Sequence, residues 1–279
     1  MSVNTLAPIA ARKPPPAPER GWTGTRIAGH VLMALWIVSG AVLLLYLANN
    51  VMSPFVQRYW SQYLEGAVVT IELVALSMVL GALLSLPIAL ARSSRNPILS
   101  GLAYGYVYLF RGTPLLAQLF LIYYGLGSFR GFFSDIGLWW FFRDAWYCAI
   151  FSFTLNTAAY QAEILRGAVQ NIDKGQWEAA SSLGLGKGVT FFRIILPQAL
   201  IVALRPYGNE LVLMIKGSAI VSIITIFDLM GHTRRSFSRS YDFQAYIWAA
   251  VLYLMMVEGL RRIWDRLEAR LTRHLKRSA

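Results

Sequence analysis

The sequence has few of the residues from which enzymes build metal sites and nucleophilic centres. Its 279 residues include one cysteine, Cys148, and three histidines, His30, His232 and His274, which are far apart in the chain. A single cysteine cannot form a disulfide within the chain, and Cys148 has no cysteine or histidine neighbour at metal-ligand spacing. We interpret Cys148 as a small packing residue. We predict neither a metal site nor a cofactor bound by this chain.

Charged residues are also scarce. Asp, Glu, Lys and Arg make up 14% of the chain, whereas 56% is hydrophobic, and an average soluble domain has about 25% charged residues. The deficit lies in long apolar runs, which are typical of a membrane protein. The formal net charge is +12. In so apolar a chain this charge indicates basic residues held at the cytoplasmic membrane face, and we predict no binding to nucleic acid.

Six apolar segments predict an all-α membrane protein with about six transmembrane helices. The first segment could be a signal peptide, but its apolar core is long and Leu47-Ala48-Asn49-Asn50 shows no small-residue cleavage pattern. We therefore interpret it as a retained helix. The third segment is interrupted at Arg111-Gly112-Thr113-Pro114, and an aromatic loop typical of a membrane interface follows it. The segments cover approximately residues 31–47, 66–90, 98–124, 145–165, 194–215 and 246–260.

The two ends of the chain are basic. Residues 1–27 are rich in proline and arginine and predict a disordered tail, followed by an extra N-terminal transmembrane helix at 28–50. Residues 261–279 predict an amphipathic basic helix at the membrane surface. Six spans place both ends on one side, which the positive-inside rule makes the cytoplasm. One outer loop is an exception to this rule, because it contains Arg234, Arg235 and Arg239.

The segment between the fourth and fifth spans is polar and short. Residues 175–184 predict a helix of about two turns that ends at Gly184. Such a helix either rests on the membrane surface or docks into a partner, and periodicity alone leaves both interpretations open. The following Gly186-Lys187-Gly188 superficially resembles a phosphate loop, but no Ser or Thr follows the lysine. We therefore predict no nucleotide site in this chain.

This segment resembles the EAA loop of ABC-type importer permeases. Glu178-Ala179-Ala180 is followed by Gly184 and then by Ile195-Leu196-Pro197. The resemblance implies a type I ABC importer permease fold, whose loop forms a coupling helix seated in a groove of a separate ATP-binding subunit. That partner would use ATP and Mg, and this chain would not be an enzyme. The implied coupling residues are Gly175, Gln176, Glu178, Ala179, Ala180, Leu183 and Gly184.

Three further stretches resemble the polar amino acid branch of these permeases, and the resemblance covers about residues 63–260. They are Phe110-Arg111-Gly112-Thr113-Pro114-Leu115-Leu116, Ala159–Gly167, and Asn209-Glu210 with Lys216-Gly217-Ser218-Ala219. The last of these looks more like permeases for histidine, lysine, arginine, ornithine and opines. We assign residues 61–260 to the permease core. The extra N-terminal span departs from the five-span pattern of the branch.

Few polar residues fall within the predicted spans, and these are candidates for the substrate path. Asn156, Tyr160 and Glu163 lie on one helical face. Glu163 could bind a cationic substrate group or pair with Arg166, and these alternatives remain open. Arg111 could meet a substrate carboxylate or cap the break before Pro114. Asn209 and Glu210 follow Arg205-Pro206, where we expect an interruption that exposes backbone to a cavity.

These observations predict an importer that works by alternating access in the bacterial inner membrane. The expected partners are cytoplasmic ATP-binding subunits, a periplasmic solute-binding protein, the lipid bilayer and a second permease subunit. We favour a paralogue as the second permease, and a homodimer is the alternative. An ion-coupled secondary transporter is the rival hypothesis, but we find no internal repeat typical of that class. A membrane-embedded enzyme is a third hypothesis. It is disfavoured because the sequence shows no paired carboxylates and no nucleophile–histidine arrangement.

Overall fold

The structure is a computed structural model that describes residues 22–273, and the described residues contain helices and no strand. The chain divides into two units, residues 1–57 and 58–279, which are described separately. In the first unit, α1 (Gly24–Asn50) has 27 residues and is apolar on all sides. At 1.5 Å per residue it is about 40 Å long, enough to cross a membrane. It begins within the predicted tail of residues 1–27, most of which lies outside the described residues.

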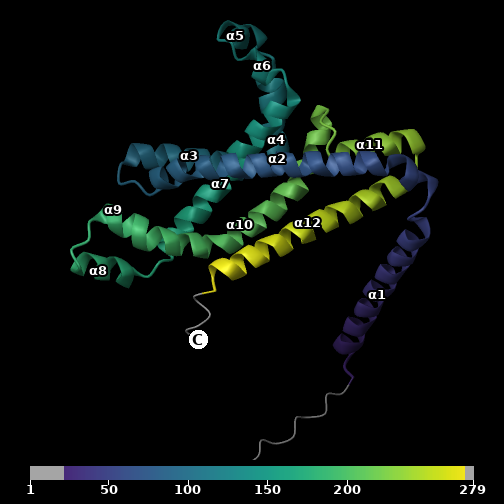
Figure 1. Ribbon diagram of the computed structural model, residues 1–279, viewed down its shortest axis with the longest axis horizontal. Helices are drawn as coiled ribbons and strands as arrows, with labels where there is room; N and C mark the ends of the chain where they lie inside the picture. The colour runs from purple at the N-terminus through teal and green to yellow at the C-terminus, as the bar shows by residue number, and fades with distance from the viewer. Residues whose placement is uncertain (1–21, 274–279) are drawn as a thin grey trace, which may run out of the picture. The chain divides into compact units, whose positions relative to one another are not determined.

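The second unit is built around five long helices. They are α2 (Pro54–Arg92), α3 (Pro97–Gly112), α7 (Ala145–Gln170), α10 (Leu196–Ser218) and α12 (Gln244–Leu271) (Figure 1). By length and apolar composition, three helical segments of the described chain qualify as membrane spans: Gly24–Asn50, Pro54–Arg92 and Lys187–Ile224. The number of six spans therefore stays a prediction.

Small residues allow the long helices to approach closely. Ala158, Ala159 and Ala162 of α7 are fully buried, and so is Ala199 of α10, with which α7 packs extensively. In a membrane, where lipid is as apolar as leucine, such close backbone packing is a main source of helix association. Larger buried side chains form a second cluster in this bundle. It joins α2, α7, α10 and η3 (Ala219–Ile224), and its buried members include Leu73, Phe153, Ile215 and Val221.

The break in the third predicted span is present. Helix α3 ends at Gly112, Thr113 and Pro114 are extended, and α4 (Leu115–Phe120) then continues into the π-helical segment η1 (Leu121–Leu126). Proline disfavours a helical conformation of the residue before it, which explains why the chain opens at Thr113.

The prediction of a helix interruption at Arg205-Pro206 is wrong. Helix α10 continues through Pro206 to Ser218. A proline removes one backbone donor, whereas unwinding a turn at membrane depth would expose several polar groups. The irregular turn lies earlier, in the π-helical segment η2 (Phe191–Ile195) that precedes Pro197.

The C-terminal amphipathic segment is helical as far as Leu271, and α12 runs into it from the last predicted span without a break. The Nε1 of Trp264 donates a hydrogen bond to the carbonyl of Leu204 on α10 (2.8 Å), and Arg205 forms a salt bridge with Glu268 (2.7 Å). Part of the predicted lipid-facing side therefore packs on α10. Residues 274–279 lie outside the described residues.

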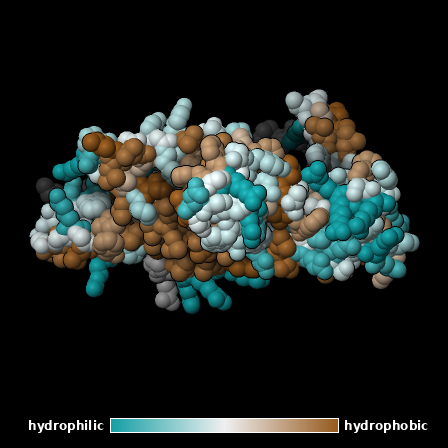
Figure 2. Space-filling model, turned by 90° about the horizontal axis from the view of Figure 1, so that it is seen from above, coloured by the Kyte–Doolittle hydropathy of each residue, from teal (hydrophilic) through white to brown (hydrophobic). Residues whose placement is uncertain are grey.

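The short helices lie at the periphery of the second unit. Helices α8 (Lys174–Ser182) and α9 (Lys187–Thr190) lie at the end where α2 passes into α3 (Figure 1). Helices α5 (Arg130–Asp135) and α6 (Trp139–Phe142) project from the bundle at the top of the view, and α11 (Leu229–Ser240) lies at its upper right. In Figure 2, hydrophobic side chains cover much of the middle of the face shown, and hydrophilic side chains gather over α11 at the right.

Candidate transport path and coupling surface

Helix α8 is closed at both ends by local hydrogen bonds. Asp173 caps its start, because its Oδ1 accepts a hydrogen bond from the backbone N–H of Gly175 (2.7 Å). At its end Gly184 has φ +69°, the N–H of Gly184 bonds to the carbonyl of Ser181, and the N–H of Leu185 bonds to the carbonyl of Ala180. This is a Schellman motif, in which glycine takes the left-handed position. The helix predicted at 175–184, and its end at Gly184, are confirmed.

The outer surface of α8 and the residues after it are exposed. Trp177 packs against a small core that includes Ile195 and Ala199, and so anchors the helix. Leu183 is 77% exposed and Phe192 64%, although both are apolar. Of the implied coupling residues, Gly175, Gln176, Glu178, Ala179, Leu183 and Gly184 are exposed, whereas Ala180 is buried beneath the helix. Exposed apolar side chains on an otherwise polar segment are typical of a docking surface.

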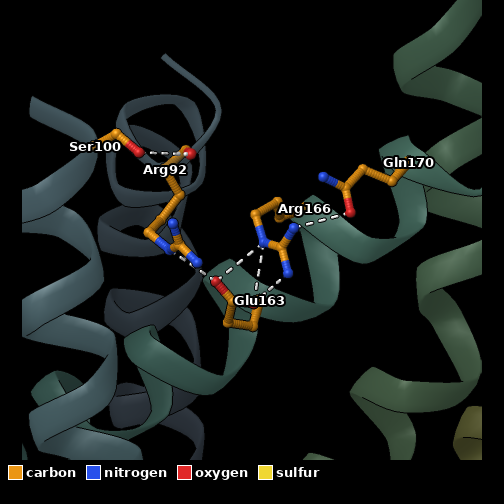
Figure 3. Close-up of polar contacts among 5 residues, drawn as sticks. All are labelled: Arg92, Ser100, Glu163, Arg166 and Gln170. Atoms are coloured by element: carbon orange, nitrogen blue, oxygen red, sulfur yellow. Dashed lines mark hydrogen bonds and ion pairs between the residues drawn. The ribbon is translucent and has the colours of Figure 1, made fainter. Parts of the chain in front are cut away.

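Glu163 lies between two guanidinium groups (Figure 3). Its Oε2 is 2.7 Å from Nη2 of Arg166, one turn away on α7, and its Oε1 is 3.1 Å from Nε of Arg92 at the end of α2. Arg166 also donates to Gln170 (2.8 Å). The side chains of Arg92, Glu163 and Arg166 are 17%, 13% and 25% exposed, so water screens these pairs only partly. The ion pair of Glu163 with Arg166 is one of the two alternatives predicted from the sequence. The ion pair of Glu163 with Arg92 was not predicted.

A cavity of about 310 Å³ lies beside this ion pair. Arg92, Arg111, Tyr160 and Glu163 are among the residues that line it. The guanidinium carbon of Arg111 lies 5.1 Å from the centre of the Tyr160 ring, within range of a cation–π interaction. Helix α7 therefore does present Tyr160 and Glu163 on one face, toward α3.

Gln118, not Arg111, closes the break between α3 and α4. Its Nε2 donates to the carbonyls of Phe110 (2.9 Å) and Thr113 (3.1 Å), which the end of α3 leaves without helical partners. Its Oε1 accepts a hydrogen bond from Nδ2 of Asn156 (2.9 Å). Asn156 thus belongs to the break rather than to the cavity. The sequence signal for Gln118 was a lone polar residue in the apolar run Leu115-Leu116-Ala117-Gln118-Leu119-Phe120.

Asn209 and Glu210 face different surroundings because they are adjacent on a continuous helix. Glu210 is 5% exposed, and its Oε1 accepts a hydrogen bond from Oγ1 of Thr157 on α7 (2.9 Å). No salt bridge to Glu210 forms within residues 22–273. Asn209 is exposed and lines a separate cavity of about 320 Å³ with Arg205 and Trp264. The predicted path residues therefore lie in four places instead of one.

Comparison with known proteins identifies the family. Residues 81–273 match the model of the binding-protein-dependent transport system inner membrane component. The chain belongs to this family. As an inner-membrane component of a transport system it is not an enzyme.

Several relatives of known name are similar over most of their length. The nopaline transport system permease NocM of Agrobacterium fabrum is 44% identical over 208 residues, which are 74% of this chain and 86% of that protein. The arginine ABC transporter permease ArtM of Haemophilus influenzae is 39% identical and is aligned over 67% of this chain and 81% of its own.

Solved structures agree with this fold. An amino acid ABC transporter with histidines has a TM-score of 0.68 and 34% identity, and the match covers 76% of this chain and 95% of that one. The inward-facing MetNI methionine ABC transporter has a TM-score of 0.63 at 20% identity, with coverage of 76% and 96%. The predicted type I ABC importer permease fold is thereby confirmed.

Proposed function

We propose that this chain is the permease subunit of an ATP-driven importer of cationic amino acids or opines. Relatives at 38–44% identity are named as permeases for nopaline, octopine and arginine. The family membership also disfavours the rival hypothesis of an ion-coupled secondary transporter. The chain would lie in the bacterial inner membrane with both termini in the cytoplasm.

The observation that carries the proposal is the exposed surface of α8. A nine-residue helix with capped ends, an anchoring Trp177 and outward-facing Leu183 is suited to seat in a groove of another protein. The alternative is that α8 is a simple connector that rests on the lipid surface. Helix α8 and the turn after it are closed by local hydrogen bonds, and such a preformed segment loses little conformational entropy on docking. We assign this surface to the ATP-binding subunit, which would hydrolyse ATP with Mg.

Transport would proceed by alternating access. Closure of two ATP-binding subunits would move two α8 helices inward, and two permease cores would open a central path to a periplasmic solute-binding protein. The second permease would be a paralogue or a second copy. This chain contributes the coupling surface and half of the path.

Glu210 is the best candidate in this chain for contact with a cationic solute. A carboxylate at membrane depth is costly unless it is paired or faces a wet cavity. Both carboxylate oxygens of Glu163 are engaged by arginines, whereas a neutral hydroxyl donates to Glu210. A ligand ammonium or guanidinium near 4 Å would gain about 4 kcal/mol at an effective dielectric constant of 20.

The test is uptake by proteoliposomes that contain the whole complex and its solute-binding protein. We expect ATP-dependent uptake of radiolabelled arginine or an opine, competition by lysine, and little competition by glutamate. Glu210→Gln should reduce uptake of the cation with basal ATPase unchanged, and Glu72→Gln, an exposed position on α2, serves as the control. Uptake that persists with an inactive ATP-binding subunit would contradict the proposal.

A further inference from the structure

The connection between η1 and α7 is rich in aromatic residues. Residues 127–144, which we call the aromatic connection, contain five phenylalanines and two tryptophans but only two large aliphatic side chains, Ile136 and Leu138. Helices α5 and α6 lie within it, and neither has a buried residue. They project from the bundle (Figure 1). Apolar side chains that the described part of the chain leaves uncovered in such number indicate contact with a partner or with the membrane.

The aromatic connection is held together by its own side chains. The ring centres of Phe133 on α5 and Phe142 on α6 are 4.2 Å apart, and Phe142 also contacts Phe151 on α7 (6.4 Å). Helix α5 ends in a Schellman turn, in which Gly137 has φ +73° and the N–H of Leu138 donates to the carbonyl of Phe133 (2.8 Å). Helices α5 and α6 are thus fixed to each other and to α7, so their exposed side chains point in set directions.

Helix α5 has an apolar side and a polar side. Phe129, Phe132 and Ile136 recur at spacings of three and four, so they lie on one side of the helix. They are 61%, 61% and 51% exposed. Arg130 and Ser134, which lie on the opposite side, are exposed as well. The apolar side therefore faces away from the bundle core without a covering element among the described residues.

The kind of apolar residue indicates what covers this surface. The exposed surface of α1, a helix of membrane-spanning length, consists largely of aliphatic side chains such as Leu32, Val38 and Leu44. The aromatic connection instead exposes phenylalanine and tryptophan, and Trp140 contacts Tyr147 at the start of α7 (5.4 Å). Tryptophan and tyrosine gather at the level of the lipid headgroups, and helices that lie in this region expose tryptophan and phenylalanine on their apolar side.

The charges of the aromatic connection cancel. It contains two arginines and two aspartates, namely Arg130, Arg143, Asp135 and Asp144. The guanidinium carbon of Arg130 lies 5.6 Å from the centre of the Trp139 ring. A segment without net charge does not select a charged surface of a protein partner. An apolar side next to charged and polar side chains is instead suited to the boundary between headgroups and acyl chains.

We propose that the aromatic connection is an interfacial anchor, with Phe129, Phe132 and Ile136 inserted into the bilayer and Ser134 in water. The inserted side chains would lie about 5–10 Å into the boundary between headgroups and acyl chains. Because α6 is fixed to α7 and η1 leads into the connection, the anchor would hold the ends of both at the membrane surface. The proposal rests on the inner-membrane location of the family. It is independent of the solute and of the side of the membrane on which the connection lies.

The experiment measures the depth of nitroxide spin labels in the whole complex, reconstituted in nanodiscs of phosphatidylcholine. Phe132→Cys and Ile136→Cys are labelled in a Cys148→Ala background, and Ser134→Cys is the matched control on the opposite side of the same helix. Spin relaxation by oxygen, which partitions into lipid, is compared with relaxation by a water-soluble nickel chelate. We expect the ratio of oxygen to nickel accessibility to be several-fold higher at Phe132 and Ile136 than at Ser134. Complex yield checks that the variants assemble.

Three outcomes would overturn the proposal. High nickel accessibility at all three labels would place the apolar side of α5 in water. Low accessibility to both agents at Phe132 and Ile136 would mean that protein covers this side. Oxygen accessibility at Ser134 as high as at Phe132 would place the whole helix in hydrocarbon. None of these measurements uses solute uptake, so the anchor can fail while the proposed function stands, and the reverse also holds.

Discussion

At the scale of single residues, the carboxylate of Glu163 receives hydrogen bonds from two helices. Arg92 reaches it from the end of α2 and Arg166 from the next turn of α7. Arg92 also lies 4.9 Å from the centre of the Tyr104 ring on α3. The carboxylate of Glu163 therefore joins α7 to α2, and its partner Arg92 extends the contact to α3, beside the segment that leads to α8.

Replacement of Glu163 by glutamine tests this structural role. Glu163→Gln leaves two partly buried guanidinium groups without their counterion, which we expect to destabilise the complex by about 1–3 kcal/mol. Complex yield and uptake should fall alike for arginine, histidine and an opine. The measurement combines yield, basal ATPase and uptake in one preparation.

The control is the double variant Arg92→Gln/Glu163→Gln, which removes one of the cations left unpaired and should recover part of the yield. Loss of uptake for the cationic solute alone, with normal yield and ATPase, would instead assign Glu163 to the substrate path.

Asp228 gives a prediction about pH. Burial raises the pKa of Asp228 from 3.8 to about 6. The folded chain therefore binds more protons than the unfolded chain between these values, so the free energy of unfolding falls as pH rises from about 4 to about 6 and is constant above. The change is on the order of 3 kcal/mol at most, because one pKa unit corresponds to about 1.4 kcal/mol.

The measurement is the thermal unfolding midpoint of the purified complex in detergent between pH 4.5 and 8. Asp228→Asn should remove this part of the pH dependence while its side-chain oxygen still caps α11. Asp135→Asn, at an exposed position on α5, should leave the profile unchanged. A wild-type midpoint that rises between pH 4.5 and 6 would contradict the prediction.

At the scale of elements, the end of α8 depends on one backbone conformation. Gly184 has φ +69°, where a residue with a β-carbon is strained by about 1–2 kcal/mol. No atom lies within 4 Å of a β-carbon built there, so a larger side chain would project into the surface where we place the ATPase.

Gly184→Trp should leave membrane insertion intact but reduce ATP-driven transport at least about tenfold, since strain and bulk both alter the docking surface. Gly184→Asn is the matched control, because asparagine accepts the left-handed conformation with a small side chain. The assay compares solute-stimulated ATPase with uptake in the same vesicles. Wild-type coupling in the tryptophan variant would refute the coupling role of α8.

At the scale of the whole molecule, the arrangement across the membrane can be tested with single cysteines. In a Cys148→Ala background, cysteines at Ser94 and Ser182 should react with an impermeant maleimide from the cytoplasmic side only. A cysteine at Ser134 should react from outside. These three positions are at least partly exposed in this chain alone, so Ser182→Cys is labelled in the absence of the ATP-binding subunits that would cover α8.

The expected pattern follows from the six-span topology, in which α8 must face a cytoplasmic ATPase. Labelling of Ser182→Cys from outside would rule that topology out. Permeabilised vesicles, in which all three cysteines should react, provide the control for accessibility.

Local patterns in the sequence determined most of the helical elements. Apolar runs located the long helices, Pro114 located the break before α4, and Gly184 located the end of α8, because these features act through neighbouring residues along the chain. The capping by Asp173 is local as well, because its side chain accepts a hydrogen bond from the backbone N–H two residues further on. The EAA-type segment was likewise readable because it is contiguous.

Tertiary structure decided which polar groups meet. Arg92 is 71 residues from Glu163 and Thr157 is 53 residues from Glu210, so no spacing in the sequence pairs them. The same applies to the break between α3 and α4. Arg111 was a predicted candidate to cap it, but Gln118, one turn beyond Pro114, donates the hydrogen bonds to the carbonyls of Phe110 and Thr113. Pro206 misled the prediction because a packed bundle tolerates one missing hydrogen bond. Side-chain partners depend on how helices cross, and helix crossing is set by close packing of small residues that a linear pattern does not specify.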